Sequence, residues 1–225
     1  MKNLFRPIDM PQKNFIFLGE AGCGKSEIAM NFAIRLAKDG RKIVFFDLDM
    51  TKPLFRSRDE KEKLQSFGVE LRYEEQFADA PVTVGGLSAA LRDSGTYTVA
   101  DVGGDSLGAL AIGRYAPLLE HGDTAVFYTI NPYRAWSDTA EHIYLVMEET
   151  LAAARLPFSK LHFIANPNYG KDTAKDDVLN GLKRLKNLLQ DKVTFTFVSC
   201  PEDIAPDVSR EQTHPVFPIR TLIRY

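Results

Sequence analysis

An eight-residue loop carries the strongest chemical signal in the sequence. Residues 19–26 read G-E-A-G-C-G-K-S and match G-x-x-x-x-G-K-[ST], the pattern of a phosphate-binding loop. Glycines let successive backbone N–H groups turn inward around phosphate oxygens, and the N-terminus of a following helix adds partial positive charge. Lys25 is expected to reach the β- and γ-phosphates, and the Ser26 hydroxyl to coordinate Mg²⁺. The predicted nucleotide-binding residues of the loop are Gly19, Glu20, Ala21, Gly22, Cys23, Gly24, Lys25 and Ser26.

A dinucleotide-binding loop is the competing interpretation of the same glycines. The pattern G-x-G-x-x-G requires a third glycine where this sequence has Glu27. The sequence therefore favours a phosphate loop for a nucleoside triphosphate.

Acidic residues follow two of the predicted strands. Asp47 and Asp49 close the strand at 43–46, and Asp101 closes the strand at 96–100, with Gly104 three residues later. Parallel sheets place their ligands at the carboxyl ends of the strands. A metal-bound triphosphate needs a carboxylate near Mg²⁺ and a glycine N–H facing the γ-phosphate, roles that suit Asp101 and Gly104.

The elements that must position these residues follow from the hydrophobic pattern. Short apolar runs alternate with helical spacing, which is typical of a parallel sheet covered on both faces. We expect a doubly wound, mostly parallel α/β sheet in a single domain covering residues 1–225. The predicted strands are 15–18, 43–46, 69–73, 96–100, 124–130, 161–165 and 193–198, and the helices 28–37, 85–93, 105–120, 136–154 and 174–190.

Composition excludes several classes of protein. The net charge of −2 supplies no bulk field for nucleic acid or anionic lipid, so neither partner is expected. The cysteines Cys23 and Cys200 form no metal-binding or disulfide framework, which suits a cytoplasmic protein. No apolar run is long enough to span a membrane, and the tail at 217–225 is too short and proline-rich for stable lipid contact. The four histidines have no metal-ligand spacing.

Taken together, the motifs resemble the ParA/MinD class of P-loop ATPases, which includes metallocentre-maturation ATPases of the CooC type. The resemblance covers roughly residues 14–205. It rests on the phosphate loop, the D-x-D and D-x-x-G strand ends, and three later segments: Ile130-Asn131-Pro132, Ile164-Ala165-Asn166-Pro167 and Ser199-Cys200-Pro201-Glu202-Asp203.

This resemblance implies a role for each matching residue. Asp49 would position the attacking water, Asp47 would support the Mg²⁺ shell, and Asp101 would be the Walker-B acid. Asn166 would contact the base, with Pro201 beside it. The guanine-reading N-K-x-D is replaced by N-P-N-Y at 166–169, so the resemblance implies ATP as the nucleotide.

The sequence departs from the class at Glu20. Its members carry there a lysine that crosses a dimer interface to the partner's nucleotide, whereas a carboxylate repels phosphate at close range. An ATP-dependent homodimer is therefore expected to be weaker, or to use other surfaces such as residues 55–58. Phe55, Arg56 and Arg58 lie where the class has its nucleotide-sensing segment, and a solvated charged turn is the alternative interpretation.

Three functions remain open at this point. The first is a slow Mg²⁺-dependent ATPase that switches an unidentified protein partner or assembly. The second is a small-molecule kinase or ATP-dependent ligase of the dethiobiotin-synthase kind, for which the sequence shows no acceptor cluster. The third is a nucleotide-binding module with negligible turnover, which Glu20 makes plausible.

Overall fold

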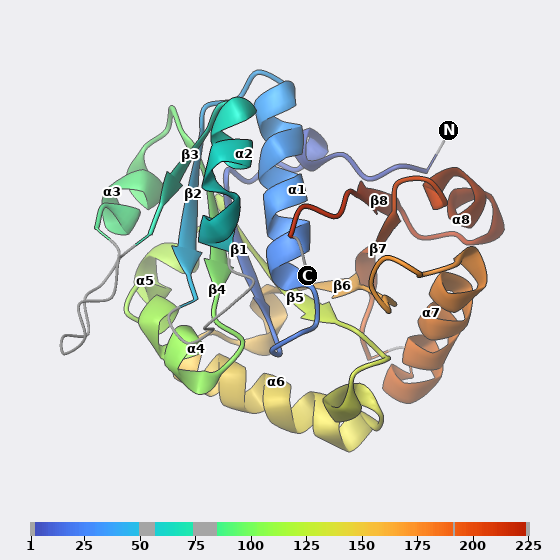
Figure 1. The fold of residues 1–225 in the computed structure, drawn as a ribbon. Coiled ribbons are helices and arrows are strands. Elements are labelled where there is room, and N and C mark those ends of the chain that lie inside the picture. The colour runs from blue at the N-terminus through green and yellow to red at the C-terminus, as the bar shows by residue number, and fades with distance from the viewer. Residues whose placement is uncertain (1–2, 50–56, 74–84, 191, 224–225) are drawn as a thin grey trace.

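The computed structural model describes residues 3–49, 57–73, 85–190 and 192–223. At its centre lies one eight-stranded sheet with the order β3-β2-β4-β1-β5-β6-β7-β8, and its paired strands run parallel (Figure 1). The predicted doubly wound α/β fold is therefore confirmed. The strands are β1 (Asn14–Gly19), β2 (Ile43–Leu48), β3 (Val69–Arg72), β4 (Tyr97–Val102), β5 (Thr124–Ile130), β6 (Leu161–Ala165), β7 (Phe195–Pro201) and β8 (Val216–Ile219).

Helices cover both faces of the sheet. They are α1 (Lys25–Lys38), α2 (Lys61–Ser66), α3 (Leu87–Arg92), α4 (Ser106–Gly113), α5 (Ala116–Leu119), α6 (Ala140–Ala154), α7 (Lys175–Leu189) and α8 (Ala205–Glu211). The core consists of two hydrophobic clusters, to which alternate residues of β1 contribute. Phe15 and Phe17 belong to the cluster with α1 and α2. Ile16 and Leu18 belong to the cluster with the helices α3 to α8. Burial on both faces explains why β1 has a continuous apolar run instead of alternation.

Two predicted helices are shorter than expected. The pattern at 105–120 divides into α4 and α5, which begins with Pro117 in its first turn, where a missing N–H costs no helical bond. The pattern at 136–154 divides into the 3-10 turn η3 (Ala135–Ser137) and α6, because Thr139 caps α6 by accepting a hydrogen bond from the His142 N–H.

The sequence analysis missed α8 and β8 beyond the strand it placed last. Pro218 argues against a strand at this position, because proline has no N–H to donate to the hydrogen-bond ladder of a central strand. Here β8 is the edge strand: Pro215 and Ile219 accept hydrogen bonds from the β7 side through their carbonyl groups. Val216 faces the other way, toward residues 3–5, and Pro218 shares that outward direction two residues later.

The chain end after β8 is tied to α1. The Asn31 side chain accepts a hydrogen bond from the backbone N–H of Arg220 and donates one to the backbone carbonyl of Arg220. The Glu27 carboxyl accepts hydrogen bonds from the backbone N–H groups of Leu222 and Ile223. We call residues 220–223 the C-terminal strap. Within the described ranges, no helix is both long and apolar enough to cross a membrane.

Candidate nucleotide-binding site

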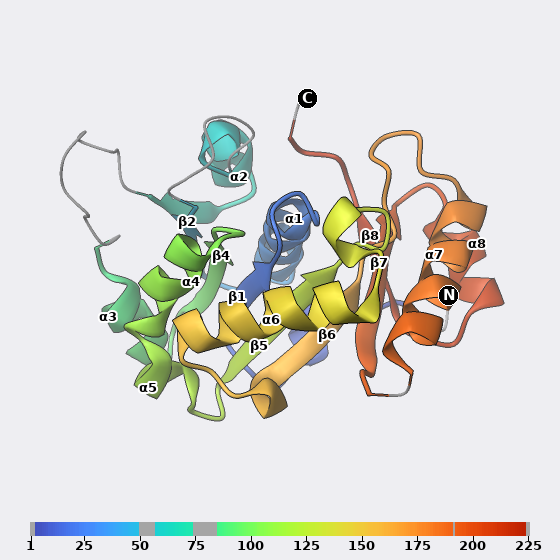
Figure 2. The same ribbon diagram turned by 90° about the horizontal axis from the view of Figure 1, so that it is seen from below.

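The phosphate loop lies at the carboxyl edge of the sheet, between β1 and α1. Viewed toward that edge, the start of α1 lies between α4 and the turn that precedes α6 (Figure 2). Gly24 is the N-cap of α1 and has φ 92°, a left-handed conformation that favours glycine. A side chain there would also clash, since a Cβ would lie 2.2 Å from the Asn166 Nδ2. The structure thus requires glycine at this motif position for two separate reasons.

Lys25 is buried inside this arrangement with only 1% of its surface exposed. Its Nζ finds no hydrogen-bond partner among the described residues. Gly104 lies directly over it: a Cβ on Gly104 would lie 2.8 Å from the Lys25 Nζ and 2.4 Å from the Ala21 backbone nitrogen. An ammonium group in this position is strongly disfavoured unless an anion pairs with it.

The predicted strand-end acids are brought together. The register of β2 and β4 places Asp47 directly beside Asp101, and both side chains are fully buried. The Asp101 Oδ2 accepts a hydrogen bond of 2.6 Å from the Ser57 hydroxyl. Asp49 follows β2 and is also buried, with its backbone N–H donating to the Asp47 Oδ1 at 3.0 Å.

The Asp47 carboxylate forms an ion pair with Arg58. Its Nε donates to the Asp47 Oδ2 at 2.9 Å, its backbone N–H donates to the same oxygen at 3.0 Å, and its Nη2 donates to the Asp49 carbonyl at 2.7 Å. The solvated charged turn considered for this residue is therefore wrong, because its guanidinium lies in a largely buried ion pair. Phe55 and Arg56 lie outside the described residues.

Asn166 is buried beneath the loop and engaged at both ends of its amide. Its Nδ2 donates to the Cys23 carbonyl at 2.7 Å, and its Oδ1 accepts from the Ser199 hydroxyl at 2.8 Å. The side chain therefore braces the phosphate loop from β6, a structural contact that the sequence did not indicate. Pro201 ends β7 at the same edge of the sheet, so residues 199–201 continue the strand that was predicted to end at residue 198.

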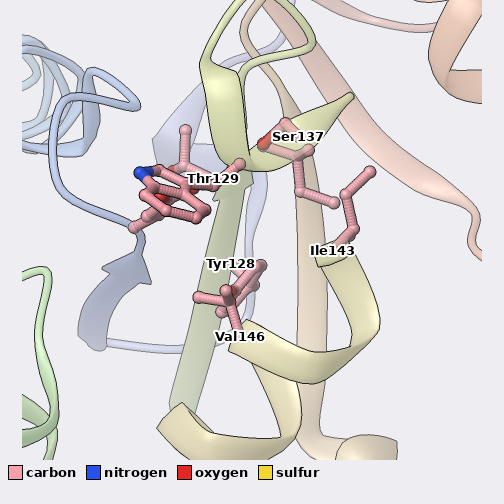
Figure 3. A pocket seen from close by; sticks show the side chains of 8 residues that line it. Tyr128, Thr129, Ser137, Ile143 and Val146 are labelled. Atoms are coloured by element: carbon pink, nitrogen blue, oxygen red, sulfur yellow. The ribbon is translucent and has the colours of Figure 1, made fainter. Parts of the chain in front are cut away.

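Glu20 lines a pocket between the phosphate loop, β5 and α6 (Figure 3). The other residues of that pocket are Tyr128, Thr129, Ile130, Trp136, Ser137, Ile143 and Val146. Burial raises the pKa of the Glu20 carboxyl, while the charges of Lys25 and His142 lower it. Both the raised pKa and the nearby Lys25 ammonium moderate the repulsion between Glu20 and an anion in the loop.

A Mg²⁺ ion at this site would need phosphate oxygens as ligands in addition to those from the protein. No group of three or more His, Cys, Asp or Glu suited to a metal ion occurs in the described part of the chain. Ser26, in the first turn of α1, and the buried Asp101 supply hard oxygen atoms of the kind Mg²⁺ binds together with substrate phosphates. The donor set therefore fits an ion delivered with a nucleotide.

Comparison with known proteins agrees with this geometry. Residues 15–201 match the family model described as the CobQ/CobB/MinD/ParA nucleotide binding domain. No curated protein sequence matches the chain.

Solved structures with the same fold include three FtsY proteins. The signal recognition particle receptor FtsY from Elizabethkingia anophelis, in complex with GDP, gives a TM-score of 0.54 at 13% identity over 88% of this chain and 59% of that one. Chloroplast FtsY from Physcomitrella patens gives 0.56 at 15% identity, covering 84% and 59%. FtsY from Mycoplasma mycoides gives 0.56 at 15%, covering 85% and 62%.

At such low identity these similarities show the fold alone, and the chain spans about three fifths of the length of those structures. The family match, by contrast, is a match of the sequence itself, and it covers most of this chain, from β1 to the end of β7. The chain belongs to the CobQ/CobB/MinD/ParA family of P-loop nucleotide-binding domains.

Proposed function

We propose that the protein binds ATP with Mg²⁺ and hydrolyses it slowly, as a switch acting on a protein partner. One observation carries the proposal: the Lys25 ammonium is buried, has no hydrogen-bond partner among the described residues, and lies under Gly104 at the phosphate loop. A polyphosphate would supply the hydrogen-bond acceptors that this ammonium lacks, together with negative charge.

The remaining residues would divide the work of phosphoryl transfer. Backbone N–H groups of the loop would cradle the phosphates, and the Gly104 N–H would face the γ-phosphate. The Ser26 hydroxyl and Asp101 would hold Mg²⁺, the ion that neutralises charge on the β- and γ-phosphates. Such chemistry consists mainly of positioning and charge stabilisation, so no nucleophilic side chain is required.

The two acids after β2 would have different tasks. Asp49 would orient the attacking water. Asp47 can support the Mg²⁺ shell only if Arg58 releases it, because the guanidinium now donates to both of its carboxylate oxygens. We therefore expect the Arg58–Asp47 pair to rearrange when nucleotide and metal bind.

Nucleotide choice rests on Asn166 and Pro201. An amide carries two N–H donors and a carbonyl oxygen with two lone pairs. The hydrogen bonds to Cys23 and Ser199 use one donor and one lone pair, which leaves capacity to read the amino group and ring nitrogen of adenine. The FtsY structure with GDP shares the fold alone and does not decide this point.

The partner would be a protein, in the cytoplasm, with an ATP-dependent homodimer as one form of the switch. Glu20 stands in place of a cation that would bridge two copies, so this dimer should be weak. Neither nucleic acid nor membrane is expected as a partner, since the charge balance favours neither.

Calorimetric titration and phosphate release test the proposal together. Mg-ATP, Mg-GTP and Mg-tripolyphosphate are titrated into the full chain, and phosphate release is followed with and without candidate small-molecule acceptors. The proposal expects tighter binding of ATP than of GTP and slow, acceptor-independent release. Acceptor-dependent turnover would favour a kinase or ligase, binding without turnover would indicate a binding module, and absence of binding would overturn the assignment of the site.

A further inference from the structure

Arg134 lies at the rim of the phosphate loop, although it comes from a distant part of the chain. It follows β5 by four residues, and its Nε donates a 2.9 Å hydrogen bond to the Gly22 carbonyl. Gly22 is a loop residue with φ 77°, and a Cβ added to it would lie 3.9 Å from the Arg134 Nε. The guanidinium is thus hydrogen-bonded to the backbone of the phosphate loop.

The backbone around Arg134 is held on both sides. Its N–H donates to the Asn131 carbonyl at 3.2 Å, and its own carbonyl accepts from the Ser137 N–H at 3.0 Å. Asn131 is buried, and its side chain donates to the Asn168 carbonyl after β6. The position of Arg134 is therefore set by β5, η3 and the loop after β6, and does not depend on its own exposed side chain.

The anchoring bond uses only one of the five N–H donors of the guanidinium. The side chain is exposed, and its two terminal nitrogens donate to no acceptor among the residues that the structure describes. Planar forked donors on arginine match phosphate oxygens in pairs, and charge-assisted bonds of this kind are stronger than neutral ones.

The side chains of the phosphate loop have no excess of positive charge, so a further cation would favour the binding of an anion there. Within residues 19–26, Glu20 carries a carboxylate and Lys25 an ammonium, so the side chains of the loop have no net positive charge to offset a polyphosphate. A fixed guanidinium on the rim restores the positive potential that such an anion requires.

We propose that Arg134 is a second cation of the nucleotide site, which binds the polyphosphate from the rim of the loop while Lys25 binds it from within. This inference rests on the proposed function. It adds a binding residue supplied by the same chain, which contacts the loop at Gly22, whereas Gly104 lies close to Ala21 and Lys25.

Three substitutions separate charge from loop support. Arg134→Gln keeps an N–H donor for the Gly22 carbonyl and loses the charge, Arg134→Lys keeps the charge on a flexible stem, and Arg134→Ala loses both. Arg210→Ala is the matched control, because Arg210 is an exposed arginine on α8 paired with Asp207. The probes are Mg-tripolyphosphate and Mg-ATP, titrated by calorimetry at low and at high salt.

We expect Arg134→Ala and Arg134→Gln to weaken both probes about tenfold at low salt and less at high salt, whereas Arg134→Lys stays within about threefold of wild type. Arg210→Ala should bind as wild type does. Wild-type affinity in Arg134→Gln, with loss in Arg134→Ala, would overturn the inference by showing that Arg134 only supports the loop. Equal affinity in all variants would overturn it too. If wild type binds neither probe, the proposed function itself fails.

Discussion

The two charged residues of the first turn of α1 lie in opposite situations. Lys25 and Glu27 are two positions apart, and both are largely buried. Lys25 faces the phosphate loop, and its Nζ has no hydrogen-bond partner among the described residues. Glu27 faces the C-terminal strap and accepts hydrogen bonds from two backbone N–H groups there. The Lys25 ammonium thus lacks a hydrogen-bond partner among the described residues, whereas the Glu27 carboxyl is hydrogen-bonded by the chain itself.

The comparison separates a binding site from a structural one. A buried ammonium without a hydrogen-bond partner among the described residues is costly, and an anionic ligand would compensate for its desolvation. Removing Lys25 should therefore harm binding and spare the fold, whereas removing Glu27 should harm the fold first.

The largest expected effect follows substitution of Lys25. Lys25→Met keeps the aliphatic stem and removes the ammonium, so Mg-ATP affinity should fall at least about 100-fold while the melting temperature of the free protein does not fall. Calorimetry and thermal unfolding measure the two quantities. Lys38→Met is the control, since Lys38 is exposed in the last turn of the same helix. Unchanged ATP affinity in a folded Lys25→Met protein would break the comparison.

Asp49 sharpens the functional side of the comparison. Asp49→Ala should bind Mg-ATP normally and hydrolyse it at least about 100-fold more slowly, the usual scale for losing a positioned base. Single-turnover phosphate release gives the rate. Sedimentation of the same variant with and without Mg-ATP measures the dimer, which should be weak because of Glu20. Full hydrolytic activity would remove Asp49 from the mechanism, and a tight dimer would show that the bridging lysine is dispensable.

Glu27 tests the structural side. Glu27→Ala leaves the N–H groups of Leu222 and Ile223 without their acceptor, at a cost of about 1–3 kcal/mol for each group that stays buried. Urea unfolding of the free protein should show this loss. Glu62→Ala is a suitable control, because Glu62 is an exposed acid on the neighbouring helix α2. A variant as stable as wild type would mean that the strap contributes nothing.

The same carboxyl predicts a pH dependence of stability. Burial raises the pKa of Glu27 from 4.5 to about 7, Glu60 adds to the rise, and Lys63 and the two backbone hydrogen bonds oppose it. Because the folded state holds the proton more tightly, this contribution to stability is full below about pH 4.5 and is lost as pH rises through about 7. The stability of wild type relative to Glu27→Gln should therefore fall between about pH 5 and 7.5. A difference that is constant across this range would contradict the direction of the shift.

The smallest expected effect concerns Asn166. If its amide reads adenine, Asn166→Ala should weaken Mg-ATP more than Mg-tripolyphosphate, by about 0.5–1.5 kcal/mol for each lost neutral hydrogen bond. Ser199→Ala removes the hydroxyl that donates to the Asn166 Oδ1 and keeps the hydrogen bond from Asn166 to the loop. It therefore distinguishes the orientation of the amide from its direct contact with the base. Equal losses for the two ligands would assign Asn166 to loop support alone.

Sequence reasoning succeeded where the signal is local. The phosphate loop, the strand-end acids Asp47 and Asp101, and the seven strands from β1 to β7 follow from patterns within a few residues. It also placed these acids at the ligand-binding edge, because parallel sheets bind their ligands at the carboxyl ends of the strands.

What it missed depends on contacts between distant segments. Arg134 reaches a carbonyl 112 positions earlier, and the strap reaches Glu27 across 195 positions. Arg134 follows Asn131-Pro132 at a strand end, which is a weak signal for a cation near a ligand. No spacing rule indicates that Arg58 pairs with Asp47 or that a chain end containing prolines adds an edge strand.

The most direct test of the account is a crystal structure of the full chain with Mg²⁺ and a non-hydrolysable ATP analogue. The account predicts phosphate oxygens within hydrogen-bond distance of the Lys25 Nζ and the Gly104 N–H, and Mg²⁺ near Ser26 and Asp101. A nucleotide bound elsewhere, or a Lys25 ammonium that still contacts no anion in the complex, would contradict it.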